Sequence, residues 1–315
     1  MEYNKWIADL EAGDEIEGFY ILKSAQIKTT NTGKAFLAGA VADRSGAIDV
    51  KIWDYAGPLG TQDEGAVVKL RGNVSEYRGA LQLIISRIRP AQEGDNYDPG
   101  ELVPTAPIDA DAAWRELLAL ADSIRDQDYR SVCQMILQQN GQRFRTIPGG
   151  KSVHHSFLNG LLMHTLYMAR TAEFLAGLYE EVVDRDLLLA GTILHDVAKC
   201  REFNTSPLGL VTEYSVSGEL LGHLVMGAQA VAETAQALEI PEEKSLLLQH
   251  MLLSHHGDPE FGAAVRPMCA EAELLSLIDL VDSRMEIYKE NLEETNVGQF
   301  SKRIFALEKK IYRHR

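Results

Sequence analysis

A histidine and an aspartate stand side by side in an apolar run of this 315-residue chain. His195 and Asp196 lie within the largely apolar stretch 192–199. Such a run predicts the end of a buried helix, so both side chains are expected in the interior. An unpaired polar group or charge is costly there. A divalent metal ion would pair them, because imidazole nitrogen and carboxylate oxygen suit Zn, Mn, Fe or Mg.

Further potential ligands occur in similar apolar, helix-like settings. The ordered set is His164, His195, Asp196, His223, His255, His256 and Asp279, which includes five of the nine histidines. A single buried histidine is more often a hydrogen-bonded core residue than a ligand. A whole ordered set favours a metal site over that structural explanation. His223 has the weakest claim, and Asp282, one helical turn after Asp279, competes for the role of the distal carboxylate.

The elements that would carry these ligands are helices. Asp109 or Asp111 is suited to cap the first of them, and a second is expected over about 129–139, ending at Asn140-Gly141. From residue 152 the pattern is helical almost to the end, and a last, charged helix is expected over 299–315. We therefore predict an all-α helical bundle over residues 109–315.

The N-terminal part has a different pattern. After a short helical lead-in over 1–13, apolar alternation predicts five strands, over 18–26, 35–42, 47–53, 67–74 and 81–87. Five short strands within residues 1–90 predict a small OB-like barrel, a fold that commonly binds oligonucleotides. Residues 91–108 are rich in proline and glycine and are expected to form a linker.

The third predicted strand offers a nucleic-acid contact. Its alternation places Ile48, Val50 and Ile52 in the barrel and turns Lys51 and Trp53 outward. Trp53 would stack on a base while Lys51 binds a phosphate. The alternative is that Trp53 packs against the barrel rim or the neighbouring domain.

The bulk composition limits the possible classes. Hydrophobic residues make up 45% and charged residues 24%, as in an ordinary globular protein. No apolar run reaches the roughly 18–20 residues that span a bilayer, and no signal-peptide pattern opens the chain, so no membrane partner is expected. Three widely spaced cysteines predict reduced thiols and a cytoplasmic location. The net charge of −15 argues against non-specific nucleic-acid binding over the whole surface but leaves a local basic groove open.

Four segments carry a resemblance to a known family: 154–165, with a His-His pair and His164; His-Asp-Val-Ala-Lys at 195–199; Leu-Ser-His-His-Gly at 253–257; and Asp-Leu-Val-Asp-Ser-Arg at 279–284. They resemble HD-domain metal phosphohydrolases, and the added histidines match the two-metal subgroup. With the β-rich N-terminal module, nearly the whole chain resembles the YhaM-type 3′–5′ exoribonucleases. No Gly-Tyr-Pro signature follows the His-Asp pair, which disfavours cyclic-dinucleotide hydrolysis.

The resemblance implies two divalent metal ions, with Mn favoured and Fe, Co, Ni or Zn compatible with the ligand types. His164, His195, Asp196 and Asp279 would hold the first ion. Asp196 would bridge to the second, held by His223, His255 and His256. Two ions about 3.5–4 Å apart can share a hydroxide for in-line attack on phosphorus, without a dedicated side-chain general base.

The catalytic residues implied are Asp196 and Lys199. The family pattern places Lys199 near the substrate phosphate, where its charge would stabilise the nonbridging oxygens; the alternative is a surface lysine. Lys151 and His155 are the further substrate contacts expected on this domain, and neither matches a metal position.

The expected function is thus a metal-dependent 3′–5′ exonuclease on single-stranded RNA, with single-stranded DNA left open. One rival is an HD-domain nucleotidase or cyclic-nucleotide phosphodiesterase, which the acidic charge favours. A second is a non-catalytic nucleic-acid-binding protein, which the complete ligand set disfavours. A homo-oligomer is left open.

Overall fold

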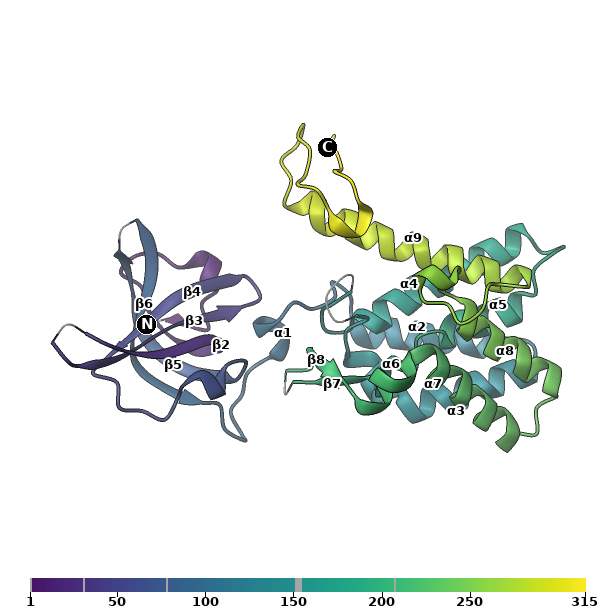
Figure 1. Cartoon of the computed structure of the whole chain (residues 1–315), viewed down its shortest axis with the longest axis horizontal. Coiled ribbons are helices and arrows are strands. Elements are labelled where there is room, and N and C mark those ends of the chain that lie inside the picture. The colour runs from purple at the N-terminus through teal and green to yellow at the C-terminus, as the bar shows by residue number, and fades with distance from the viewer. Residues whose placement is uncertain (1, 31, 78, 151–154, 207) are drawn as a thin grey trace. The chain divides into compact units, whose positions relative to one another are not determined.

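The computed structural model describes residues 2–30, 32–77, 79–150, 155–206 and 208–315. The chain divides into two compact units, Met1–Pro104 and Thr105–Arg315 (Figure 1). The division falls inside the predicted linker 91–108. No helix among the described residues is long and apolar enough to cross a membrane.

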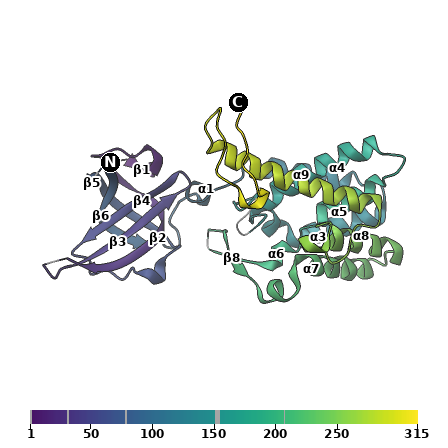
Figure 2. The same cartoon turned by 45° about the horizontal axis from the view of Figure 1, so that its top comes forward.

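The first unit is a closed five-stranded barrel (Figure 2). Its strands are β2 (Glu15–Thr29), β3 (Ala35–Asp43), β4 (Gly46–Trp53), β5 (Val67–Tyr77) and β6 (Ala80–Pro90). Neighbours pair in the order β2-β3-β4-β6-β5, and β5 pairs back with β2 to close the barrel. Only the β4–β6 pair among these is parallel. This confirms the five predicted strands and the OB-like barrel.

Bulges and glycines let these long strands bend. The register shifts between Leu22 and Ser24 in β2 and between Arg71 and Gly72 in β5. A Cβ on Gly72 would meet the Ile84 carbonyl oxygen of the neighbouring strand. Glycine therefore permits a close backbone approach at the bulge, where the strand turns around the core.

The segments that flank the barrel differ from their prediction. The described part of the predicted helical lead-in, residues 2–13, forms no α-helix; it gives β1 (Glu2–Tyr3), which pairs with β2, and a 3-10 turn at Ile7–Asp9. The Ile7 amide donates to the Asp43 carboxylate, which fixes this segment on the barrel. After β6, Tyr97 packs its ring 5.0 Å from that of Phe19, and a short α1 (Pro99–Leu102) follows. Residues 91–104 thus belong to the first unit.

The second unit is a helical bundle. Its helices are α2 (Ala110–Asp122), α3 (Gln127–Thr146), α4 (Gly160–Leu178), α5 (Arg185–Leu194), α6 (Lys199–Glu202), α7 (Val216–Ala237), α8 (Glu242–Ser254) and α9 (Ala270–Glu293). The side chains of Asp109, Asp126, Asp184 and Ser215 cap the amides that open α2, α3, α5 and α7. One continuous hydrophobic core joins α2, α3, α4, α5, α8 and α9.

Three features of this unit depart from the prediction of helices alone. A small hairpin, β7 (Phe203–Thr205) and β8 (Val211–Tyr214), separates α6 from α7. The predicted helix over 299–315 is absent; a short antiparallel turn forms instead, with Ile304 and Ile311 packed on Ile287 of α9. Helix α3 continues through Gly141 to Thr146, and the Trp114 ring lies beside that glycine.

Candidate metal centre

Helix α5 delivers the His-Asp pair. Its residues from Leu187 to Leu194 are all buried, and the Asp184 side chain caps its first turn. The helix ends at Leu194, so His195 and Asp196 follow inside the bundle, 0% and 2% exposed. The predicted interior position of the pair is therefore correct.

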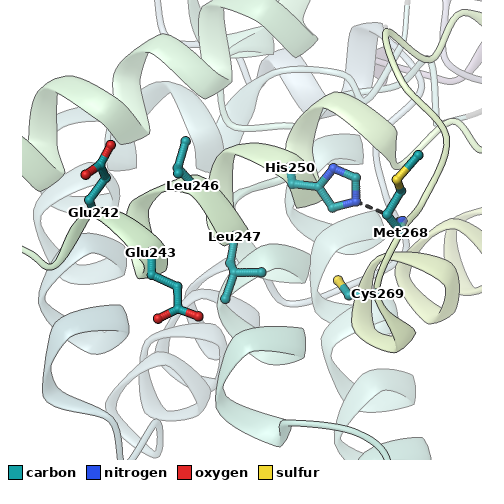
Figure 3. Close-up of a pocket in the computed structure, with 7 residues that line it drawn as sticks. All are labelled: Glu242, Glu243, Leu246, Leu247, His250, Met268 and Cys269. Atoms are coloured by element: carbon teal, nitrogen blue, oxygen red, sulfur yellow. Dashed lines mark hydrogen bonds between the residues drawn. The ribbon is translucent and has the colours of Figure 1, made fainter.

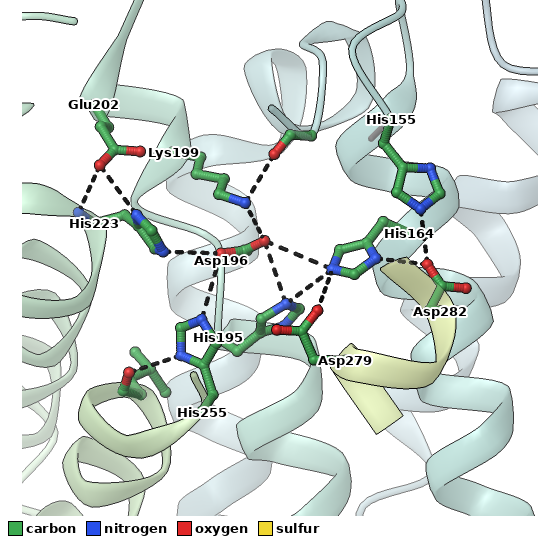
Figure 4. Close-up of polar contacts among 12 residues, drawn as sticks. His155, His164, His195, Asp196, Lys199, Glu202, His223, His255, Asp279 and Asp282 are labelled. Atoms are coloured by element: carbon green, nitrogen blue, oxygen red, sulfur yellow. Dashed lines mark hydrogen bonds and ion pairs between the residues drawn. The ribbon is translucent and has the colours of Figure 1, made fainter. Parts of the chain in front are cut away.

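The two oxygens of Asp196 face different groups of imidazoles (Figure 4). Oδ2 lies 3.3 Å from Nε2 of His195 and 3.7 Å from Nε2 of His164. Oδ1 lies 3.4 Å from Nε2 of His223 and 3.8 Å from Nε2 of His255. One carboxylate thus stands between two clusters, as a bridging ligand would.

The first cluster comprises His164 of α4, His195, Asp196 and Asp279 of α9. The Nε2 atoms of His164 and His195 are 3.2 Å apart, and Asp279 Oδ1 is 3.4 Å from the same His164 atom. Asp282 lies on the other side of that ring, where Oδ2 accepts from His164 Nδ1 at 2.7 Å. The geometry separates the two competing carboxylates: Asp279 faces the cluster, and Asp282 orients one of its histidines.

The second cluster comprises His223 of α7 with His255 and His256, which follow α8. One ring nitrogen from each lies within 4.8 Å of the others. Helix α7 is broken at Gly222, whose φ of 71° and ψ of 161° are open to glycine at little cost. This break leaves the His223 amide free to donate to Glu202 Oε1 at 2.9 Å.

Four imidazoles are held from behind by their Nδ1 atoms. The acceptors are Asp282 for His164, the Thr192 carbonyl for His195, Glu202 for His223 and the Leu252 carbonyl for His255. Since a carboxylate or carbonyl can only accept, each Nδ1 carries the proton and each Nε2 presents a lone pair. Metal-bound histidines are oriented in this way.

Several buried atoms at the centre of the site have no hydrogen-bond partner among the described residues. They are Asp196 Oδ1, His223 Nε2, His255 Nε2 and His256 Nδ1. A buried polar atom left unsatisfied is costly. A divalent cation would satisfy this set, and imidazole with carboxylate suits Mn, Fe, Co, Ni or Zn. The residues present therefore fit the metal ions that the sequence predicted.

The ionisation states of His255 and Asp196 also suit ligation. Burial, with the neighbouring His195 and His256, holds the pKa of His255 well below its usual value, so that imidazole is neutral. Burial would raise the pKa of Asp196, but the neighbouring charges, that of Lys199 first among them, outweigh it and hold that pKa well below its usual range. A neutral imidazole and an ionised carboxylate are the forms that bind metal.

Lys199 points into the site. Its Nζ donates to Asp196 Oδ2 at 2.6 Å and to the Gly149 carbonyl at 2.8 Å. Burial would lower the pKa of Lys199, but the Asp196 carboxylate outweighs it and raises that pKa, so the ammonium persists. A surface lysine is thereby ruled out, and a positive charge lies directly beside the two clusters.

Two further substrate contacts, Lys151 and His155, were predicted on this domain. Lys151 lies outside the described residues, as does His154. His155 is 1% exposed, and its Nε2 donates to Asp282 at 2.8 Å. It lies behind His164, where it contacts the same Asp282 carboxylate. A substrate contact by His155 stays a prediction.

Two positioning carboxylates were not singled out for this role from the sequence. The buried Glu202 and the partly buried Asp282 are the acceptors behind His223 and His164. The one available signal for Asp282 was its spacing of one helical turn after Asp279. For Glu202, nothing in the apolar pattern indicates that its side chain turns toward a residue 21 positions later.

His250 belongs to a different feature. It lines a pocket along α8 with Glu242, Glu243, Leu246, Leu247, Met268 and Cys269 (Figure 3). Its Nε2 accepts from the Met268 amide at 2.9 Å and so fixes the loop before α9. No predicted ligand lines this pocket, which assigns His250 a structural role.

On the barrel, Trp53 and Lys51 face outward as predicted, and Ile48, Val50 and Ile52 are buried. The Trp53 side chain is 50% exposed. Phe36 packs its ring 5.1 Å from Trp53, and Lys51 Nζ lies 5.6 Å from the Trp53 ring and 4.9 Å from that of Tyr77. These residues form an exposed aromatic surface with one cation.

Together the fold and the site define an HD-domain metal phosphohydrolase joined to an OB-like barrel. The HD-domain family model matches residues 161–284. The chain belongs to the YhaM family of 3′-5′ exoribonucleases. It is 34% identical over 307 residues to 3'-5' exoribonuclease YhaM of Bacillus licheniformis, covering 96% of this chain and 95% of that protein.

Two further proteins are similar to this chain. The YhaM protein of Listeria innocua is 35% identical over 312 residues, which is 98% of this chain and 97% of that protein. The second is an OB domain of known structure from Thermoplasma acidophilum. The match covers 31% of this chain and 92% of that domain's chain, at 16% identity and with a TM-score of 0.25.

Proposed function

We propose that this chain is a metal-dependent 3′–5′ exonuclease that hydrolyses phosphodiester bonds of single-stranded RNA. The observation that supports this most strongly is the position of Asp196 between two clusters of imidazoles whose Nε2 atoms converge on it. The exoribonuclease names of the relatives, which match nearly the whole chain, support the choice of RNA.

The proposed cofactor is a pair of divalent ions, with Mn favoured by the family resemblance. His164, His195, Asp196 and Asp279 would hold one, and Asp196, His223, His255 and His256 the other. When bound, such a pair polarises a phosphoryl oxygen and activates water at neutral pH.

The chain's own groups supply position and charge. Asp196 holds both halves of the site together, and Asp282 and Glu202 keep the imidazoles of His164 and His223 aimed at it. The Lys199 ammonium, beside Asp196, is placed to stabilise negative charge on the nonbridging oxygens of the phosphate. His155 steadies Asp282 from behind.

The barrel would hold the strand away from the cut. Trp53, with Phe36 and Tyr77 near it, offers a platform for bases, and Lys51 offers a phosphate contact. Stacking accepts any base, so this surface does not distinguish RNA from DNA; that distinction needs contact with the 2′-hydroxyl.

The test compares 5′-labelled single-stranded RNA, DNA of the same sequence, mononucleotides and cyclic nucleotides under Mn²⁺. We expect the labelled RNA to shorten progressively from its 3′ end. Turnover of the small molecules alone would replace the proposal with a nucleotidase or cyclic-nucleotide phosphodiesterase. Tight RNA binding without turnover would make the chain a non-catalytic binding protein.

A further inference from the structure

A block of four cations lies on the outer face of β5 and β6, opposite in character to the chain's net charge of −15. Lys69 pairs in register with Arg89, and Arg71 with Arg87. Leu70, which lies between Lys69 and Arg71 in β5, is 1% exposed and faces the core. The four cations therefore lie on the outer side of the barrel. We call Lys69, Arg71, Arg87 and Arg89 the basic block.

Two of the four cations are already neutralised. Lys69 Nζ lies 3.2 Å from Glu17 Oε1, and Arg89 makes a two-fold hydrogen bond with the carboxylate of Asp95, at 2.7 and 2.8 Å. Arg71 and Arg87 are exposed, and their guanidinium groups have no ion-pair partner among the described residues. The block therefore keeps a net excess of two positive charges.

The pairing of Arg71 with Arg87 is unfavourable in itself. Residues directly opposite in an antiparallel pair have Cβ atoms about 4.5–5.5 Å apart, and like charges there destabilise the sheet. Two arginines at directly opposite positions are suited to an anion that accepts from both, and arginine matches the geometry of phosphate.

A groove lies beside these arginines. It is lined on one side by Ile52 and Tyr55, which flank Trp53 in sequence, and on the other by Arg71 and Arg87; its volume is about 600 Å³. The parallel pairing of β4 with β6 ends at Lys51 and Ile84, so the groove follows the place where the two strands part.

From this geometry we infer that the basic block binds the phosphate backbone of the RNA strand, through Arg71 and Arg87. This inference rests on the proposed function for the identity of the polyanion. It adds a second contact surface, on β5 and β6, to the stacking surface at Trp53. The block recognises charge and spacing, so its contribution is independent of base sequence.

The test measures binding of a fluorescent oligouridylate of about 20 nucleotides, by anisotropy, over a range of salt. All proteins carry Asp196→Asn, so the RNA stays intact. The test variant adds Arg71→Gln and Arg87→Gln. The matched control adds Arg115→Gln and Arg125→Gln, two exposed arginines of the second unit, and so removes the same charge elsewhere.

Each phosphate contact on a single strand contributes about 0.7 to the slope of log Kd against log salt. The test variant should therefore show a slope shallower by about 1.4. The ratio of its Kd to that of the parent should fall about 25-fold when salt rises from about 50 to about 500 mM. The control should keep the parent slope. The melting temperature of the test variant should stay equal or rise, because a like-charge pair has been removed.

An unchanged slope in the test variant, or an equal change in the control, would overturn the inference. Polyglutamate of equal charge is the competing polyanion. If it displaces the labelled strand as effectively as unlabelled RNA does, and if this displacement depends on Arg71 and Arg87, the inference is also overturned. The basic block would then bind an acidic protein. Degradation of RNA by the parent chain without the substitutions is measured in parallel. If RNA is degraded while the slope is unchanged, the basic block alone is refuted and the proposed function stands.

Discussion

Glu202 offers a sensitive test of how the second cluster is held. Its Oε1 accepts two hydrogen bonds from His223, from the amide at 2.9 Å and from Nδ1 at 3.0 Å, and its side chain is 5% exposed. Glu202→Ala removes both while leaving every proposed ligand in place. The His223 ring is then free to turn away from Asp196.

The magnitude follows from the loss of this support. Removing a group that orients a metal-bound histidine typically costs about 10–100-fold in metal affinity, or about 1.4–2.8 kcal/mol. The partly buried His223 amide is left without its acceptor, which costs about 1–3 kcal/mol of stability. For a domain of this size the melting temperature should then fall by about 2–12 °C.

The assay is calorimetric titration of metal-stripped protein with Mn²⁺. We expect two binding events in the parent and a second event weakened by about 10–100-fold in Glu202→Ala, with Glu202→Gln between them because an amide oxygen still accepts. The control is Glu219→Gln, a change at an exposed residue in the first turn of α7, the helix that carries His223. Two unchanged events in Glu202→Ala would refute the role assigned to Glu202.

Three further outcomes are expected. Asp196→Asn should abolish RNA hydrolysis and weaken both metal-binding events, since this carboxylate faces both clusters; substantial turnover with Mn²⁺ supplied would contradict the bridging role. Asp282→Asn should weaken the first event by about tenfold or more and leave the second intact, as titration would show; equal weakening of both would point to a general loss of folding. Trp53→Ala should weaken binding of long strands by about five- to 150-fold, with dinucleotide cleavage hardly changed; equal losses on long and short substrates would leave Trp53 as a packing residue.

Much of the fold follows from patterns visible in the sequence. The five strands alternate because one face of each covers a small core, as Ile48, Val50 and Ile52 show. The hairpin β7–β8 was missed because strands of three and four residues are too short for alternation to stand out. The prediction of a helix over 299–315 was wrong because this segment instead folds back as a short turn that packs Ile304 and Ile311 on α9.

The candidate ligands could be found from residue type and order, since each lies in an apolar run that implies burial. Their orientation could not. That Asp279 faces the cluster while Asp282 holds His164 from behind depends on how α9 is turned against α4. The hydrogen bond from His155 to Asp282, likewise, joins residues 127 positions apart.

The number of metal ions per chain tests the central claim most directly. Elemental analysis of protein purified without a chelator, set beside Asp196→Asn, should give about two equivalents of divalent metal in the parent and far less in the variant. This result is expected because Asp196 Oδ2 and Oδ1 each face their own cluster of imidazoles. A firm value of one ion per chain, with His223→Ala retaining it and full activity, would contradict the two-metal account.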